Sequence, residues 1–308
     1  MIVVLTGGTG GAKLIEGLAA EMDPAELTII CNTGDDCVFH GLHISPDIDT
    51  IIYTLAGLSD NEKGWGIRGD TFVVLEQLRR LGNDTWFQLG DKDLATHITR
   101  TRMLVEGRRL SEITDYLRRM LGVRSTILPM SDQRIQTRVT TPRGEISFQE
   151  FFVKEHWAGE VDAVHFAGAK EAQPAHRVRE ALSGAEAVVV CPSNPVTSIG
   201  PILSVPGIRT ALIARSVPII GVSPIIGSIA ISGPAHKLMN AFGFEVSALG
   251  VAQYYADFLH TILIANEDRK LIPAIENLRI RAIASDIRMP NLAAKRRLAR
   301  ELLALVQK

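Results

Sequence analysis

The sequence predicts an α/β protein: a three-layer, Rossmann-like, doubly wound and mostly parallel sheet with an inserted helical and β-hairpin subdomain. Short apolar runs such as Ile2–Leu5 and Leu27–Cys31 alternate along the chain with segments of helical periodicity. Strands joined through helices are parallel and have right-handed crossovers, so helices cover both faces of one sheet. The chain has 308 residues, 46% of them hydrophobic, which suffices for a large core.

The first unit is a strand, a helix and a second strand. Ile2–Leu5 is a buried strand, Lys13–Met22 carries apolar residues at helical spacing, and Leu27–Cys31 is the next strand. A further helix is predicted over Pro46–Leu58, because proline is favoured in the first helical turn. These elements form a β-α-β unit followed by a polar loop and a helix.

The middle of the chain predicts an insertion, at about residues 71–158, within a single domain of residues 1–308. Its pattern is mostly helical at first, over Thr71–Leu81, Leu94–Glu106 and Ser111–Leu121, and then strand-like over Ile127–Val153. The β/α alternation resumes with Ala163–Phe166, Ala187–Cys191, Val217–Val222 and Ile262–Ala265. An amphipathic helix from Asn291 is expected to dock on the core or on a second subunit, and we expect a homodimer.

Composition and charge exclude several classes of partner. The formal net charge of −1 gives no broad electrostatic surface for nucleic acid or for an anionic membrane. The uncharged stretch Ser216–Ala235 approaches membrane-spanning length, but prolines and glycines interrupt it, so it reads as a buried strand and loop. The three cysteines, Cys31, Cys37 and Cys191, lack disulfide or zinc spacing. With no signal-peptide pattern at the N-terminus, a cytoplasmic location is expected.

A glycine-rich loop follows the first strand. Its residues Gly8, Thr9, Gly10 and Gly11 can bring backbone N–H groups and the next helix N-terminus close to a phosphate. The loop is neither a full dinucleotide fingerprint nor a Walker A loop, and a tight turn without a ligand is the alternative. Ligands of doubly wound sheets bind at the carboxyl ends of the strands. The same nucleotide or diphosphate site is therefore expected to include Ser193, Asn194, Ser198 and Ser223.

Four carboxylates follow the second strand, two in Asp35-Asp36 and two at Asp47 and Asp49. Acids beside a phosphate loop suggest Mg²⁺, which binds one or two carboxylates together with substrate phosphate oxygens. Solvated turn acids and charges at a helix start are the alternative. The intervening histidines, His40 and His43, are better explained as hydrogen-bonding or core residues than as metal ligands.

Two aromatic loops, Gly64–Asp70 and Trp86–Asp93, have the composition to hold a planar heterocycle. A loop with an anchoring tryptophan and a strand end that caps a helix are the alternatives. Arg100 and Arg102 lie on a predicted helix and are more typical of surface charges than of an arginine fork facing a diphosphate.

Together these segments resemble the 2-phospho-L-lactate transferase (CofD) family over most of the chain. The resemblance rests on blocks that occur in order: Gly7–Ala12, Asn32–Asp36, His40–Thr50, Gly64–Gly66, Trp86–Asp91, Asp93–His97, Phe148–Glu150, Pro192–Val196, Ser198–Leu203 and Val222–Ile225. It implies transfer of 2-phospholactate from lactyl-2-diphospho-5'-guanosine to 7,8-didemethyl-8-hydroxy-5-deazariboflavin (Fo). The products would be GMP and coenzyme F-420 without glutamates, and Mg²⁺ is the implied metal.

The resemblance also implies roles for individual residues. Asp49 and Gln88 would contact Fo, and Asp49 is the candidate for orienting or deprotonating the attacking hydroxyl. Asp35 and Asp36 are assigned to the metal by their type and position. Two alternatives stay open: a nucleotide-sugar-binding regulator like the gluconeogenesis factors, and an NAD(P)-dependent oxidoreductase. Asn32 stands where the latter would carry a ribose-binding acid.

Overall fold

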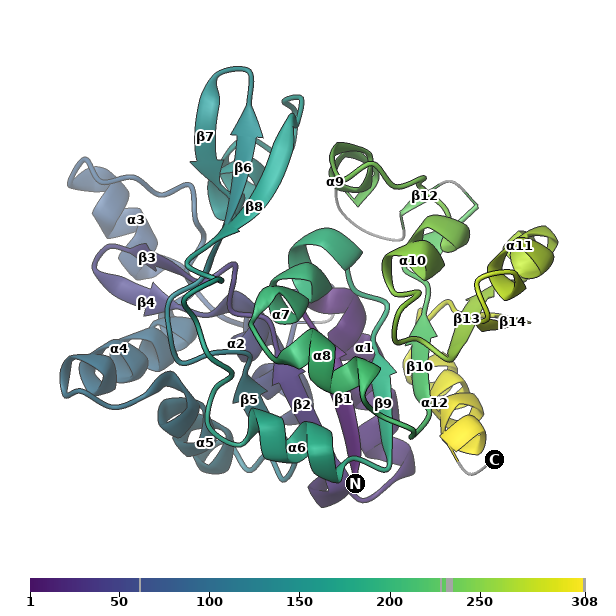
Figure 1. Ribbon diagram of the computed structural model, residues 1–308. Helices are drawn as coiled ribbons and strands as arrows, with labels where there is room; N and C mark the ends of the chain where they lie inside the picture. The colour runs from purple at the N-terminus through teal and green to yellow at the C-terminus, as the bar shows by residue number, and fades with distance from the viewer. Residues whose placement is uncertain (61, 228, 231–234, 307–308) are drawn as a thin grey trace.

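Seven parallel strands form the central sheet of the computed structural model, which describes residues 1–60, 62–227, 229–230 and 235–306 (Figure 1). Their order is β14-β13-β10-β9-β1-β2-β5. The strands are β1 (Ile2–Thr6), β2 (Leu27–Cys31), β5 (Thr126–Pro129), β9 (Ala187–Val190), β10 (Ile219–Val222), β13 (Thr261–Ala265) and β14 (Arg281–Ser285). The chain moves outward one way from β1 and then returns to β9 on its other side, as in a Rossmann-like fold. The predicted α/β class is confirmed.

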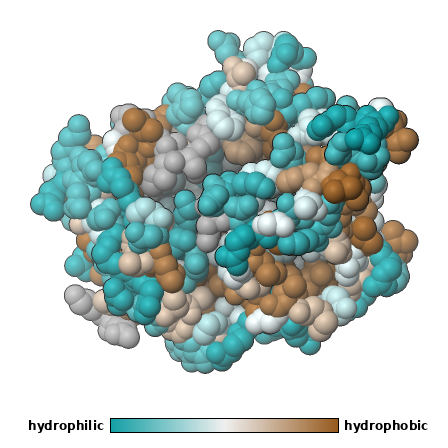
Figure 2. All heavy atoms as spheres, turned by 180° about the vertical axis from the view of Figure 1, so that it is seen from behind, coloured by the Kyte–Doolittle hydropathy of each residue, from teal (hydrophilic) through white to brown (hydrophobic). Residues whose placement is uncertain are grey.

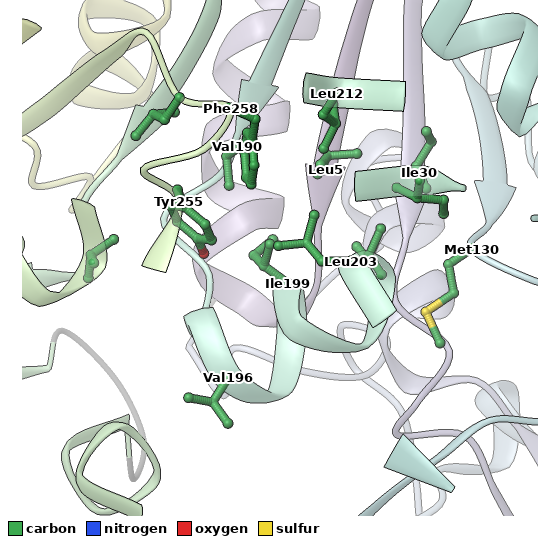
Figure 3. Packing of buried hydrophobic residues seen from close by; sticks show 14 of the residues in the cluster. Leu5, Ile30, Met130, Val190, Val196, Ile199, Leu203, Leu212, Tyr255 and Phe258 are labelled. Carbon is green, nitrogen blue, oxygen red and sulfur yellow. The ribbon is translucent and has the colours of Figure 1, made fainter. Parts of the chain in front are cut away.

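Helices cover both faces of this sheet because each strand sends alternate side chains to opposite sides. Val3 and Leu5 of β1 join one core and Ile2 and Val4 join the other. Figure 3 shows the first core, in which Leu5 and Val190 of the sheet lie near Leu203 and Leu212. Its helices are α6 (Val178–Gly184), α7 (Gly200–Ser204), α8 (Ile208–Ile213), α9 (Ala235–Ala241), α10 (Ala248–Tyr254) and α11 (Ile272–Glu276).

The second core lies under α1 (Gly8–Glu21), α2 (Pro46–Leu55), α5 (Leu110–Met120) and α12 (Leu292–Val306). Helix α12 packs on α1 at Gly17, where a Cβ atom would overlap the backbone of Lys295. The predicted C-terminal helix therefore docks on the core of its own chain.

The two crossovers next to β5 carry the extra elements. Between β2 and β5 lie the hairpin β3 (Cys37–Phe39) and β4 (Leu42–Ile44), and then α2, α3 (Val73–Arg80), α4 (Asp91–Val105) and α5. Between β5 and β9 lies an antiparallel sheet of β6 (Gln136–Thr141), β7 (Gly144–Ser147) and β8 (Ala163–Ala167), with a π-helical turn, η2 (Glu150–Lys154). This small sheet projects from the top of the central sheet in Figure 1. The stretch 71–158 thus contains only part of these additions, from α3 to η2, together with β5 of the central sheet, whereas β3, β4, α2 and β8 lie outside it.

Two strand predictions differ from the structure. Residues 163–166 were expected in the parallel sheet, but β8 pairs antiparallel with β6. Its side chains alternate between exposed and buried, as in a sheet with one open face, whereas β9 and β10 are buried throughout. The edge strand β14 was not predicted, because its pattern is mixed.

None of the described helices is long and apolar enough to span a membrane. Seen from behind, hydrophilic side chains cover much of the molecule, and smaller hydrophobic patches lie between them (Figure 2). The three cysteines are free thiols.

Candidate active site

A cavity of about 580 Å³ lies where the strand order reverses between β1 and β9. The loop after β1 (residues 7–10) and the loop after β9 (residues 192–194) form its polar end. Aromatic side chains from the crossover elements also line it. Acidic residues connect the two groups, because Asp47 accepts from Gly8 N–H and the Asp35 carbonyl oxygen accepts from Gln149, the neighbour of Phe148. Ligands of doubly wound sheets bind in this position.

Close packing explains the glycines of the first loop. A Cβ atom on Gly7 would lie 2.7 Å from Asp47 Oδ2, and one on Gly10 would lie 2.6 Å from the Pro192 carbonyl oxygen. Gly8 has a φ of +68°, a conformation that favours glycine. Only glycine therefore lets the two loops approach each other this closely.

The N–H groups of this loop have different partners. Gly8 N–H donates to Asp47 Oδ1 at 2.7 Å, so it already has an acceptor. Thr9 and Gly10 lie in the first turn of α1, where N–H groups have no acceptor within the helix. Both residues line the cavity, whereas Gly11 is buried against Thr6. Thr9 and Gly10 are thus the loop residues placed to meet a phosphate.

The second loop is tied to the first. Ser193 Oγ donates to the Gly7 carbonyl oxygen at 2.7 Å. Asn194 Oδ1 accepts from Val196 N at 2.9 Å, and so caps the π-helical turn η3 (Pro195–Ile199). Ser193, Asn194 and Ser198 all line the cavity.

Ser223 is not among the residues that line the cavity. It is fully buried, and its hydroxyl closes a turn with the backbone of Ile225. Its neighbour Pro224 lines the cavity in its place. The loop predicted over residues 223–228 is described only as far as Gly227.

Asn32 organises the acids at the centre of the cavity. Its Nδ2 group donates to Asp35 Oδ2 at 3.1 Å and to Asp47 Oδ2 at 2.9 Å, and Asn32 is itself almost fully buried. Asp35 Oδ1 and Asp36 Oδ1 are both buried without a well-formed hydrogen bond among the described residues, although the Thr137 hydroxyl acts to lower the pKa of Asp35. The carboxylates of Asp35 and Asp47 therefore accept hydrogen bonds from the same neutral amide group. Sequence reasoning noted Asn32 only as a missing ribose-binding acid.

The acids of this pair have raised pKa values. Burial raises the pKa of Asp47 to about 6, although the hydrogen bonds from Asn32 and Gly8 oppose the shift. Burial, and then the negative charge of Asp47, raise the pKa of Asp35 well above its usual range. A bound cation would stabilise the charged form of both acids and so lower both pKa values.

Asp36 points away from this pair. Its Oδ2 atom accepts from Ser45 Oγ at 2.6 Å and lies 3.0 Å from His43 Nε2, and Asp36 is not a lining residue. The two adjacent acids thus have different hydrogen-bond partners, although the charge of Asp36 still helps to raise the pKa values of Asp35 and Asp47. His40 Nε2 forms a hydrogen bond with the Asp84 carbonyl oxygen at 2.8 Å. Both histidines are thus hydrogen-bonding residues, as predicted.

Asp49 belongs to a buried network in which Asp49, Tyr53, Asp93 and His97 all line the cavity. Both of its oxygens accept hydrogen bonds from the guanidinium group of Arg100, whose side chain has no exposed surface. His97 Nδ1 lies 3.7 Å from Asp49 Oδ2, and His97 Nε2 lies 3.1 Å from Asp93 Oδ2. Tyr53 OH donates to Asp93 Oδ1 at 2.6 Å. Burial raises the pKa of Asp49, although the charges of Arg100 and His97 act in the opposite direction.

The prediction of a surface position is wrong for Arg100, but Arg102 is exposed and pairs with Glu106. Asp93, His97 and Arg100 are spaced four and three residues apart on α4, so they share one face of the helix. That spacing was the signal for an inward-facing polar stripe. Periodicity analysis overlooks it because it follows apolar residues only.

The aromatic side chains that line the cavity, its aromatic end, come from elements that are distant in sequence. Trp65 and Trp86 come from the loops predicted to hold a heterocycle, and Gln88 lines the rim with an exposed side chain. The antiparallel sheet region adds Phe148, Phe152 and Trp157. Sequence reasoning did not assign these last three aromatic residues to the site.

Fold and cavity together define a Rossmann-like α/β protein with a ligand-sized cavity at its topological switch point. The family model "2-phospho-L-lactate transferase CofD" matches residues 2–295, so the chain belongs to that family.

Relatives cover nearly the whole chain. It is 42% identical over 304 residues to a 2-phospho-L-lactate transferase of Methanosarcina acetivorans, covering 99% of this chain and 98% of that protein. It is 43% identical over 314 residues to a phosphoenolpyruvate transferase of Streptomyces griseus, with coverage of 99% and 98%. The family and these names indicate a transferase. A UPF0052-family crystal structure from Bacillus halodurans has the same fold, with a TM-score of 0.67, 17% identity and 98% of each chain covered.

Proposed function

We propose that this protein transfers the 2-phospholactyl group from lactyl-2-diphospho-5'-guanosine to Fo, which gives coenzyme F-420-0 and GMP. One observation supports this most directly: a single cavity has a phosphate-type end, an aromatic end and acidic residues that connect them. The donor diphosphate fits the polar end, and the planar deazaflavin fits the aromatic end. The reacting phosphorus and the ribityl hydroxyl then meet beside the acids.

The reaction asks for positioning and charge control more than for covalent chemistry. The ribityl oxygen attacks the lactate-side phosphorus, the bond from that phosphorus to the bridging oxygen breaks, and GMP leaves. Thr9 and Gly10 would donate backbone N–H groups to the diphosphate. Asp49 lines the cavity, and its raised pKa suits acceptance of the hydroxyl proton. Arg100 would hold that carboxylate in one orientation.

Mg²⁺ is the metal that we propose, and Asp35 and Asp47 are the residues that fit it best. They offer hard oxygen donors, and Asp35 has a buried oxygen without a well-formed hydrogen bond among the described residues. Bound there, Mg²⁺ would neutralise charge on the diphosphate. A second group, Asp49, Asp93 and His97, also has ligand atoms within 4.8 Å of one another. It fits Mg²⁺ less well, because Arg100 already pairs with Asp49 and one ligand would be a histidine nitrogen.

Turnover tests the proposal directly. The protein is incubated with Fo, Mg²⁺ and either the phospholactyl or the phosphoenolpyruvyl guanosine diphosphate, and the products are identified by mass spectrometry. We expect F-420-0 and one GMP per product with the first donor, and no reaction after treatment with EDTA. Unchanged Fo in the presence of both donors would refute the function. Turnover that EDTA leaves untouched would refute the metal.

A further inference from the structure

A strained turn presents Trp157 at the aromatic end of the cavity. His156 and Trp157 have φ angles of +50° and +47°, so two consecutive residues with side chains adopt the left-handed conformation. This conformation is uncommon outside glycine and persists only where the surroundings impose it. Within the turn, Trp157 N–H donates to the Phe151 carbonyl oxygen at 2.9 Å and Ala158 N–H to that of Glu155 at 3.0 Å.

One lysine from a distant element binds this turn. Lys237 Nζ lies 2.7 Å from the Trp157 carbonyl oxygen, 3.4 Å from that of Ala158 and 3.1 Å from that of Gly159. An ammonium group has three N–H donors, so all of them are directed to this turn. In the part of the chain that the structure describes, no carboxylate forms an ion pair with Lys237. Its charge therefore acts on backbone carbonyl groups.

The two partners of this contact are anchored differently. Lys237 lies on α9 (Ala235–Ala241), whose Leu238 and Met239 are buried in the first core. The turn belongs to the connection between β7 and β8, at the edge of the projecting antiparallel sheet. Figure 1 shows α9 and β8 on facing sides at the top of the molecule. Lys237 thus ties a peripheral segment to the main body.

The turn ends a row of three aromatic side chains. Phe148 and Phe152 stack with ring centroids 5.4 Å apart, and Phe152 and Trp157 lie 5.1 Å apart at 31°. All three line the cavity, and Trp157 is 37% exposed. A row of rings that remains accessible can bury a planar ligand face.

We propose that Lys237 is a positioning residue: it holds the His156–Trp157 turn in its left-handed conformation and so fixes Trp157 against the planar substrate. The role in substrate binding rests on the proposed function. The restraint on the turn does not, because it follows from the three carbonyl contacts and the two backbone angles alone.

Hydrogen–deuterium exchange tests the restraint without any ligand. The Lys237→Met variant keeps an unbranched side chain of similar length and removes the ammonium group. We expect amides of residues 155–159 to exchange about five- to thirtyfold faster than in the unmodified protein, the range that follows from losing one or two kcal/mol of local stability. The matched control is Lys170→Met, at an exposed lysine with no hydrogen bond or ion pair to another described residue. Equal exchange in all three proteins would refute the restraint.

A second background separates this role from general destabilisation. Glycine adopts the left-handed conformation without strain, so His156→Gly relieves what Lys237 is proposed to hold. In that background Lys237→Met should accelerate exchange by less than half of its effect in the unmodified protein. An undiminished effect would refute the strain argument.

Calorimetric titration then tests the substrate role. Lys237→Met should weaken Fo binding by about five- to thirtyfold and leave GDP binding unchanged, since GDP belongs to the other end of the cavity. Weakening of both ligands, or of neither, would refute a specific effect on the aromatic end. Fo that fails to bind even the unmodified protein would refute the proposed function, whereas the exchange result would still decide the restraint.

Discussion

Replacing Asp35 by asparagine tests whether the acid pair on Asn32 is a metal site. The amide oxygen that this substitution introduces can still accept from Asn32 Nδ2. The new amide nitrogen would take the position of Asp35 Oδ1, which has no well-formed hydrogen bond among the described residues. The variant therefore removes one buried negative charge without breaking the bond that orders the site. The expected result is higher stability without metal and no response to Mg²⁺.

The burial of Asp47 sets the size of the penalty that Mg²⁺ can offset. The pKa of Asp47 is about 6 in the folded protein and 3.8 when exposed. The folded state therefore binds a proton that the unfolded chain has already released, and stability falls as the pH rises from about 3.8 to about 6. The shift amounts to about 3 kcal/mol of unfolding free energy. Mg²⁺ at a hundred times its Kd would return about 2.7 kcal/mol, or about 5 °C in Tm.

Thermal unfolding is measured at pH 5 and pH 8, with and without Mg²⁺, for the unmodified protein and for Asp35→Asn. Mg²⁺ should raise Tm at pH 8 in the unmodified protein only, and should have little effect at pH 5, because protons then compete for Asp47. Asp60→Asn is the control, since Asp60 accepts from Glu62 and Lys63 N–H through one oxygen that an amide retains. Equal Mg²⁺ shifts in unmodified and Asp35→Asn protein would refute the assignment of the metal to Asp35.

Three further outcomes are expected. Asp49→Asn leaves the buried Arg100 without its counter-charge, so urea unfolding should show a free energy of unfolding lower by about 3–5 kcal/mol, and turnover should be lost. A stability like that of Asp60→Asn would refute the pairing. In calorimetric titrations Gln88→Ala should weaken Fo about fivefold and spare GDP, and Asn194→Ala should do the reverse, whereas equal effects on both ligands would refute the two-ended cavity. Light scattering after size exclusion should give twice the chain mass of 33.6 kDa, and a single chain mass would refute the homodimer.

The sequence was sufficient for the inner strands of the central sheet because these strands are buried on both faces. Runs such as 27–31 and 187–190 are apolar almost without interruption, so their limits were predicted within a residue. The edge strand β14 and the outlying β8 mix exposed and buried positions. Local pattern alone does not specify which sheet such strands join.

The site was predictable where its parts follow the carboxyl ends of adjacent parallel strands. Gly8 follows β1 and Asp47 lies beyond the neighbouring strand β2, and the structure brings them into contact. Asp35 and Asp36 are adjacent in sequence, yet their side chains point to different partners. Trp157 reaches the cavity only because the crossover between β5 and β9 folds back over it. Contacts of that kind depend on tertiary structure that sequence spacing does not encode.

The distribution of buried charge indicates where a cation belongs. Asp49 pairs with the buried guanidinium group of Arg100, so that network contains its own positive partner. Asp35 and Asp47 share only the neutral amide of Asn32. Two carboxylates that are buried together favour either protonation or a bound cation, because desolvation and mutual repulsion both penalise the charged pair. Above the pKa of Asp47 that acid is charged, and the acid pair beside the glycine loop then attracts a divalent ion most strongly. A donor diphosphate adds negative charge at this same position, so cation and donor should each strengthen the binding of the other.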